Sequence, residues 1–454
     1  MIRRAALIAA TLLAGCTAAP VSEMPTRGRI AESSLPPMRS FAATRPRPPL
    51  ESNANIAADF LELTFALESG RALPILTRFE TPITVRVTGT PPPSLGPDLA
   101  RLLARLRSEA GINISQTTGS TASITIQAVP SDQIRRALPQ AACFVVPNVE
   151  TIDEYRRNRR ASSTNWSLLR TRSKLAIFLP SDATPQEVRD CLHEELGQAI
   201  GPLNDLYRLP DSVFNDDNVH TVLTGFDMLI LRITYAPELA SGMSQAEVAA
   251  ELPGILARLN PRGQSLPAQP ISATPRGWID AVQTALGPGA AAGARRGAAE
   301  TAARTADAQG WHDHRSAFAY YMLGRMTQTT DPELAQRYYA TAMATLQRSP
   351  GTELHRAYVV SQTAAYAIAR GDGATALAQI RPYLAVAEQA ENAALLATLM
   401  LLEAEALDQT GQHGAAQAVR LDSLGWARYG FGADWAVRAK MREIAALNPQ
   451  RPSQ

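Results

Sequence analysis

Residues 191–205, with the sequence CLHEELGQAIGPLND, constrain the fold of this chain more than any other stretch. Apolar residues recur there at the spacing of one helix face, and acidic and amide residues can converge on another: Leu192, Leu196, Ala199 and Ile200 against Glu194, Glu195 and Gln198. Gly201 and Pro202 then interrupt the pattern. The stretch therefore predicts an amphipathic helix that ends near Gly201.

The segments before this helix predict a sheet domain. Alternating or continuous apolar residues indicate strands at 83–87, 122–129, 143–146 and 175–179. Helical spacing of apolar residues indicates helices over 57–67 and around 99–106. Thr184-Pro185-Gln186-Glu187 marks the start of the central helix. The predicted fold class is α+β, with the central helix directly after the last strand.

The N-terminus has the pattern of a secretory signal. A basic start is followed by the apolar run 5–13 and by Ala14-Gly15-Cys16, which resembles a bacterial lipobox. We therefore expect lipidation at Cys16, with an ordinary signal peptide as the alternative. The apolar run is too short to span a bilayer. By resemblance to known sorting signals, the absence of aspartate after Cys16 favours an outer membrane lipoprotein facing the periplasm.

Composition limits the partners of the chain. The formal net charge is +2, and the basic residues form no nucleic-acid-binding stripe, so no nucleic acid partner is expected. Residues 17–55 are rich in proline, serine and threonine and predict a disordered tether. Trp311-His312-Asp313-His314 places two histidines beside an acid, but its position at a helix junction favours an exposed polar loop.

Two cysteines remain beyond Cys16. Cys143 and Cys191 form a candidate disulfide in an oxidising compartment, and the alternative is two separately buried thiols. Two cysteines this far apart are too few for a thiolate zinc site.

The second half of the chain predicts paired helices. Ser244 and Glu247 fit a capping box that opens a helix to about Leu259, and a proline-containing linker follows to residue 275. Turns at 330–331, 371–372 and 411–412 then recur roughly every 40 residues and join alanine- and leucine-rich helices. The array resembles tetratricopeptide-like repeats with a longer period. Such arrays most often bind proteins, and the alternative is a stabilising appendage without a ligand.

The central helix resembles the H-E-x-x-H-x-x-G-x-x-H motif of the metzincin metalloproteases. In the best register Glu195 occupies the position of the catalytic glutamate and Gly201 that of the glycine. The three histidine positions hold Glu194, Gln198 and Asn204. Ser212-Val213-Phe214 resembles the methionine turn of that family, with phenylalanine in place of methionine. Residues 223–235 resemble a closing helix, with Thr224 and Asp227 spaced as a capping box.

The resemblance implies a zincin-like fold and gives weak support to an enzyme. Only His193 and His220 lie in this domain, so a three-histidine zinc site is excluded there. Glu194, Gln198 and Asn204 suit a hard cation better than zinc, and Asp205, Asp216, Asp217 or His220 are candidates to complete such a site. In a metal-free domain, the same side chains would hydrogen-bond across the site.

The whole segment also resembles an uncharacterised family of bacterial lipoproteins with a Glu-Glu-x-x-Gln helix followed by Asn-Asp. The predicted organisation is a signal peptide (1–16), a tether (17–55), a degenerate metzincin-like domain (56–243), a helix and linker (244–275) and helical repeats (276–450). We expect a lipid-anchored periplasmic protein that binds a protein partner through its repeats, with no required cofactor. The alternative is an atypical metal-dependent hydrolase, a divalent metal being possible, with Glu195 as general base.

Overall fold

The computed structural model of the chain describes residues 35–42 and 46–450. The predicted signal sequence and the lipidation site Cys16 lie outside these residues. In the described ranges no helix is both long and apolar enough to cross a membrane.

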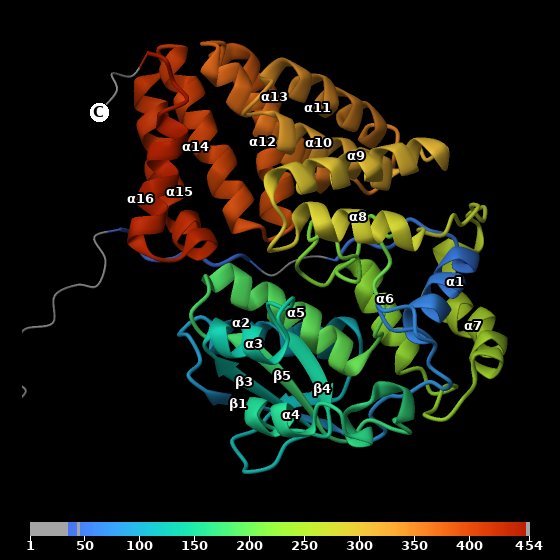
Figure 1. The fold of residues 1–454 in the computed structure, drawn as a ribbon. Coiled ribbons are helices and arrows are strands. Elements are labelled where there is room, and N and C mark those ends of the chain that lie inside the picture. The colour runs from blue at the N-terminus through green and yellow to red at the C-terminus, as the bar shows by residue number, and fades with distance from the viewer. Residues whose placement is uncertain (1–34, 43–45, 451–454) are drawn as a thin grey trace, which may run out of the picture. The chain divides into compact units, whose positions relative to one another are not determined.

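A five-stranded mixed sheet forms the centre of the first part (Figure 1). Its strands lie in the order β2-β1-β3-β5-β4, and only β4 runs antiparallel to its neighbour. The bounds are β1 (Ile83–Gly89), β2 (Ile114–Gln116), β3 (Ile124–Val129), β4 (Phe144–Pro147) and β5 (Leu175–Pro180). The strands predicted at 83–87, 122–129, 143–146 and 175–179 are thus present, and the short β2 was not predicted.

Helices cover both faces of the sheet. Helices α2 (Leu95–Glu109) and α5 (Pro185–Ile200) lie on one face, and the short α3 (Ser131–Ala137) and α4 (Ile152–Asn158) lie on the other. All six residues of β5 are buried, because Ile177 packs into the first layer while Phe178 packs into the second. A strand buried on both faces reads as a continuous apolar run. The mixed α and β class predicted for this part is therefore confirmed.

Three further helices complete the first part: α1 (Asn53–Thr64), α6 (Gly225–Thr234) and α7 (Gln245–Leu259). Both α6 and α7 begin with the predicted capping boxes, Thr224 with Asp227 and Ser244 with Glu247. The sequence grouped α7 with the linker, but Val248 and Leu252 are buried in the same core as α1 and α5. The boundary at residue 243 therefore falls too early.

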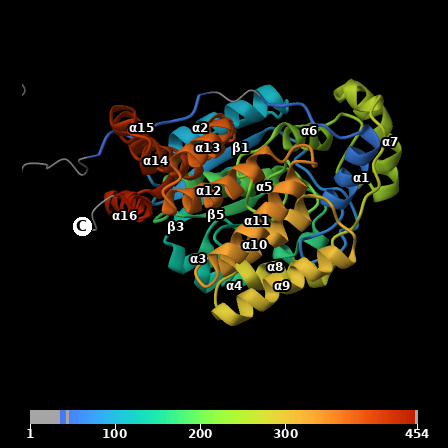
Figure 2. The same ribbon diagram turned by 90° about the horizontal axis from the view of Figure 1, so that it is seen from above.

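The rest of the chain is an array of helices in which each packs against the next. Figures 1 and 2 show α8–α13 beside one another and α14–α16 at the other end of the array. The bounds are α8 (Arg276–Leu286), α9 (Ala292–Ala308), α10 (His314–Thr327), α11 (Pro332–Leu346), α12 (Glu353–Ala369), α13 (Gly373–Gln389), α14 (Ala393–Gln409), α15 (His413–Phe431) and α16 (Asp434–Ala445). The predicted turns at 330–331, 371–372 and 411–412 each join two helices.

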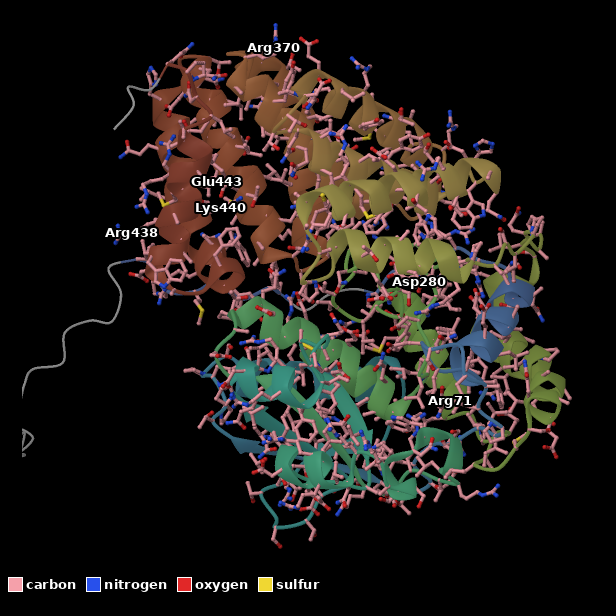
Figure 3. All side chains as sticks on the ribbon, in the orientation of Figure 1. Arg71, Asp280, Arg370, Arg438, Lys440 and Glu443 are labelled. Carbon is pink, nitrogen blue, oxygen red and sulfur yellow. A yellow bond between two sulfur atoms is a disulfide. The ribbon has the colours of Figure 1, made fainter. Side chains whose placement is uncertain are left out.

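Small residues let these helices approach closely. Gly430 of α15 has Ala394 of α14 so near that an added Cβ would lie 2.6 Å from its Cα. Charged side chains lie on the outer faces instead, as Arg370, Lys440 and Glu443 in Figure 3 illustrate, the last two as an ion pair at 3.0 Å.

The predicted tether over 17–55 is corrected by its described residues. Phe41 is buried and its ring stacks on Trp426 of α15 at 4.5 Å between centroids. The main-chain oxygen of Arg47 lies directly against Gly225, where a Cβ would clash at 1.8 Å. Residues 35–42 and 46–52 therefore pack on the folded protein. The aromatic side chain of Phe41 in this proline-rich segment is buried against Trp426.

Candidate functional site

Helix α5 is the element that the sequence singled out, and its two ends form as predicted. Thr184 caps the N-terminus by accepting a hydrogen bond from the Glu187 amide at 3.2 Å, and Pro185 occupies the first turn. At the other end the buried Arg172 guanidinium donates to the carbonyl oxygens of Gln198, Ala199 and Gly201 at 2.7–2.9 Å. These bonds satisfy carbonyls that a helix end otherwise leaves unpaired. Burial lowers the pKa of Arg172 to about 10, so it remains charged at neutral pH.

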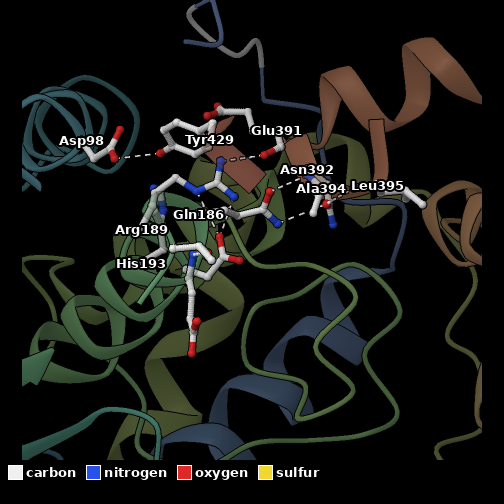
Figure 4. Close-up of polar contacts among 12 residues, drawn as sticks. Asp98, Gln186, Arg189, His193, Glu391, Asn392, Ala394, Leu395 and Tyr429 are labelled. Carbon is white, nitrogen blue, oxygen red and sulfur yellow. Dashed lines mark hydrogen bonds and ion pairs between the residues drawn. The ribbon is translucent and has the colours of Figure 1, made fainter. Parts of the chain in front are cut away.

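The N-terminal half of α5 contacts the helical array (Figure 4). Gln186 exchanges hydrogen bonds with the start of α14, donating to Oδ1 of the N-cap residue Asn392 at 3.1 Å and accepting from the Ala394 amide at 2.8 Å. Arg189 is fully buried and donates to the Glu391 main-chain oxygen at 2.6 Å. Its other end group pairs with Asp190 at 2.5 Å. This half of the helix is therefore an internal contact surface.

The same seam contains a second long-range hydrogen bond. Tyr429 of α15 donates to Asp98 of α2 at 2.7 Å, and the Arg189 guanidinium lies 5.5 Å from the Tyr429 ring centroid. Burial raises the pKa of Asp98, an effect that the Tyr429 hydroxyl and the Arg101 charge oppose. The seam thus holds both charges and hydrogen bonds inside the protein.

Cys191 of α5 is joined by a disulfide to Cys143, directly before β4, with the two Cα atoms 6.0 Å apart. The bond holds the edge strand of the sheet against the helix. It also removes both sulfurs from any role as thiolate ligands or nucleophiles.

The structure gives the amide groups of two of the three predicted metal ligands different partners. Glu194 and Gln198 share one face of α5, and the Gln198 amide donates to Glu68 Oε1 at 3.3 Å. Asn204 instead donates its side-chain amide to the Glu62 carbonyl of α1 at 3.0 Å, and its main-chain N–H to Leu63. The amide nitrogen and the main-chain N–H of Asn204 therefore fix the chain after α5 to α1.

Glu195, the predicted general base, is enclosed. Its exposed fraction is 4%, it has no hydrogen-bond partner in the described residues, and its Oε2 atom is buried. One of its carboxyl oxygens lies within 4.8 Å of a Glu194 oxygen and of the Cys143 sulfur, the only such triple of potential ligands in the described chain. Burial, followed by the charges of Glu194 and Glu68, raises the pKa of Glu195 well above its usual range.

Glu194 is the centre of a wider acidic cluster, which comprises Glu68, Glu194, Glu195, Asp205 and Asp216. Burial raises the pKa of Glu194 to about 8, with further contributions from the charges of Glu68, Asp216 and Asp190. Burial, followed by the charges of neighbouring acids, raises the pKa of Glu68 and of Asp205. Tyr207 donates to Asp216 at 2.8 Å. The charge of Asp216 thus acts on Glu194 and that of Glu194 on Asp205, but among the described residues neither aspartate joins Glu194 in a close triple of potential ligand atoms.

Asp217 and His220, also proposed as completing ligands, belong to a different group of residues. Asp217 bonds to Nε2 of His355 on α12 at 3.1 Å. The His355 ring lies 6.0 Å from His220 and 5.6 Å from His314, centroid to centroid. This histidine cluster joins the loop after α5 to α10 and α12 of the array.

The sequence analysis missed the histidine cluster because its members are far apart along the chain. It also placed His314 in an exposed loop, which is wrong: His314 is the first residue of α10, is buried, and bonds through Nε2 to the Tyr207 carbonyl at 2.7 Å. Burial and the His355 charge lower the pKa of His314 to about 4, and the same two causes lower that of His220 to about 4. Asp313, the N-cap of α10, was the available signal that a helix starts there.

The turn after α5 packs beneath the helix. An added Cβ at Gly197 would lie 3.2 Å from the Phe214 ring, so glycine lets the turn approach. Asp227 holds this turn by accepting from Ser212 Oγ at 2.6 Å, the Val213 amide at 3.0 Å and the Thr224 amide at 2.8 Å. His193 accepts the Leu223 amide at 3.2 Å, so its imidazole is engaged in the same framework.

Comparisons with known proteins match the first part of the chain. Residues 53–254 match the family described as "Protein of unknown function (DUF2927)". Neither the curated proteins nor the solved structures gave a match to the chain. The matched region begins with α1 and ends inside α7, which agrees with the core that these helices share with the sheet. Residues 53–254 therefore form a DUF2927 domain, a domain of unknown function.

Proposed function

We propose that the protein is a lipid-anchored envelope protein of the periplasm, in which a metzincin-like domain without zinc chemistry positions a helical array that binds a partner protein. The observation that supports this most is the use of α5. Its first half is bound to the array through Gln186 and Arg189, and its end is held by Arg172. A helix fixed on both sides is suited to holding two parts together.

The residues at the histidine positions argue against zinc. Glu194, Gln198 and Asn204 offer only oxygen atoms as ligands, because the amide nitrogens of Gln198 and Asn204 donate hydrogen bonds to Glu68 and Glu62. Zinc in proteins takes nitrogen and sulfur ligands far more readily than neutral amide oxygens. The resemblance to metzincins therefore extends to the order of helix, glycine and phenylalanine turn and leaves out the metal ligands.

The array offers a pocket for a partner side chain. A cavity of ≈ 240 Å³ lies where α10, α11 and α12 meet residues 217–219. Its wall is largely aromatic and aliphatic and includes Phe318, Tyr321, Met322, Leu346 and Tyr358. Arg325 also lines it, is exposed, and has no carboxylate partner among the described residues. An apolar or aromatic side chain next to an acidic residue would complement both features.

Charge-swap binding tests this assignment. Proteins from the cell envelope captured by the full chain would be compared with those captured by Tyr321→Ser, Arg325→Glu and a control, Arg304→Glu on the exposed face of α9. We expect one partner to be lost from both pocket variants and retained by the control. An acidic-to-arginine change in that purified partner should restore binding to Arg325→Glu. A partner held equally by all four proteins would overturn the pocket assignment.

The lipid anchor rests on the N-terminal sequence alone. Replacement of Cys16 by serine should abolish labelling with radioactive palmitate and release the protein from the membrane fraction. Continued membrane association of an unlabelled Cys16→Ser protein would contradict the anchor.

The alternative function, a metal-dependent hydrolase with Glu195 as general base, has weaker support. A general base must reach the proton that it removes, whereas the Glu195 carboxyl group is enclosed and burial raises its pKa well above its usual range. Peptide hydrolysis by the purified chain that is lost in Glu195→Gln, and kept in Glu251→Gln on the exposed face of α7, would establish the alternative instead.

A further inference from the structure

Helix α16 carries the most exposed large apolar side chain among the described residues. Trp435, in the first turn of the helix, is 75% exposed. The opposite face of α16 is buried through Val437 and Ile444, so the helix already packs on the array without this ring. A single exposed apolar residue is common in proteins. The role of Trp435 is therefore decided by the residues around it.

Two arginines share the exposed face of α16 with Trp435. Arg438 and Arg442 follow it at intervals of three and four residues, which places all three exposed side chains on one side of the helix. Arg442 has no carboxylate partner among the described residues, whereas Lys440 on the flank is paired with Glu443 at 3.0 Å. Tryptophan beside basic residues is typical of surfaces that meet phospholipid headgroups, because the ring occupies the interface and the cation attracts phosphate.

The N-terminal segment leaves the protein at the same end of the array. Arg428 in the last turn of α15 donates to the Pro36 carbonyl at 2.8 Å. The Arg39 amide donates to the Gly425 carbonyl of α15 at 3.2 Å. Figures 1 and 2 both show this segment at the end of the array that α15 and α16 form. Only residues 432–433 separate α15 from α16, which begins one residue before Trp435.

The length of the chain before this segment keeps the same end near a lipid at Cys16. Residues 17–34 separate Cys16 from Leu35, and even a fully extended chain of that length spans at most about 65 Å. Along the chain, the end of the array beside α15 is thus the first folded part after the anchor. Tethering raises the effective concentration of lipid headgroups around it.

We propose that the exposed face of α16, formed by Trp435, Arg438 and Arg442, contacts the headgroup region of an anionic phospholipid bilayer. The proposal rests on the lipid anchor proposed above, because a face with one aromatic ring binds weakly and needs a second attachment to remain on a membrane. Met38 and Leu421 add exposed apolar surface on the N-terminal segment and on α15. The contact orients the array relative to the membrane, which a tether alone does not do.

Quenching of tryptophan fluorescence by brominated lipid tests this contact. The full lipidated chain, purified from membranes, would be reconstituted in vesicles of phosphatidylethanolamine and phosphatidylglycerol, with and without brominated acyl chains. The emission of Trp435 is the difference between the wild-type chain and Trp435→Phe. We expect this emission to be lost in brominated vesicles and kept in the others. The loss should be smaller in Arg442→Glu, because lipid phosphate repels the new carboxylate.

A tryptophan on the DUF2927 domain is the control. Leu168 is 58% exposed, and Leu168→Trp in the Trp435→Phe background should emit equally in both kinds of vesicle. Unchanged Trp435 emission in a chain that floats with the vesicles would overturn the proposal, and so would equal losses for Trp435 and the control.

Flotation reports the anchor separately from the contact. A chain that does not float with the vesicles would refute the anchor, and with it this contact. A protein occupant is the remaining outcome: envelope proteins would shield Trp435 from aqueous acrylamide while brominated lipid left its emission unchanged, and this result would also overturn the proposal.

Discussion

The Arg189 guanidinium of α5 donates a 2.6 Å hydrogen bond to the main-chain oxygen of Glu391, a residue 202 positions further along the chain. Arg189 is fully buried, so its charge depends on this carbonyl, on Asp190 and on the Tyr429 ring. The residues at the start of the motif helix are thereby engaged in joining the DUF2927 domain to the array.

Replacement of Arg189 should separate these two parts. Arg189→Met removes the ion pair with Asp190 and the hydrogen bond to the Glu391 carbonyl, and breaking a buried ion pair costs about 3–5 kcal/mol. We expect the free energy of unfolding to fall by that amount and limited proteolysis to speed up in the linker at 261–275. Arg160→Met, at an exposed position, should change neither quantity. Equal stabilities for the two variants would show that the seam contributes little.

The disulfide should stabilise the fold because it closes a loop of the chain between Cys143 and Cys191. Cys143 and Cys191 are 48 residues apart, and closing a loop of that length stabilises a fold by about 2–4 kcal/mol. The double variant Cys143→Ser/Cys191→Ser should unfold at lower urea concentration, and dithiothreitol should affect only the wild-type chain. Two titratable thiols in the folded, unreduced protein would contradict the bond.

Local signals in the sequence predicted the elements that the sheet part uses. Thr184-Pro185 and Gly201-Pro202 delimit α5 correctly, and Thr224 with Asp227 and Ser244 with Glu247 form the expected capping boxes. These features depend on residues three or four positions apart, whose side chains meet within one helical turn. Local patterns therefore fixed the helix ends and most strands.

The remainder of the site depends on contacts between distant segments. Glu68 reaches Gln198 across 130 positions, and His355 reaches Asp217 across 138. The periodicity of a short sequence segment carries no information about residues that are more than 100 positions apart. The sequence analysis therefore proposed Asp217 as a ligand beside Glu194 and did not include Glu68 in the candidate site. The tether was misjudged for the same reason, since burial of Phe41 requires Trp426.

Asp227 should contribute more to the stability of the fold than a helix-capping residue normally does. It is fully buried and accepts three hydrogen bonds, from Ser212, Val213 and Thr224. Asp227→Asn places an NH₂ group against some of these three donors, which it cannot accept from. The loss of hydrogen bonds to a charged group should lower the free energy of unfolding by about 3 kcal/mol or more. Glu247→Gln changes the same motif at an exposed position on α7 and should cost less than about 1 kcal/mol. Urea unfolding measures both, and similar costs would contradict the structural role of Asp227 in the turn.

The histidine cluster should make stability depend on pH between about 4 and 6.5. His314 and His220 each have a folded pKa of about 4, because burial and the His355 charge disfavour the imidazolium, against 6.5 in the unfolded chain. As the pH falls from 6.5 to 4, the unfolded chain takes up protons that the folded chain does not. The free energy of unfolding therefore decreases by about 1.4 kcal/mol per pH unit for each histidine.

The acidic cluster has the opposite effect in an overlapping range, which makes a single pH curve ambiguous. The folded pKa of Glu194 is about 8, raised by burial and by the nearby acids, so its stabilising effect is complete below pH 4.5 and is lost as the pH rises to 8. The informative quantity is the stability of wild type minus that of His314→Gln, a variant that can still donate to the Tyr207 carbonyl. We expect this difference to increase with pH from 4 to 6.5 and then to remain constant. The exposed His312→Gln should give a flat difference throughout, and a flat difference for His314→Gln as well would show that His314 is protonated equally in the folded and unfolded chains.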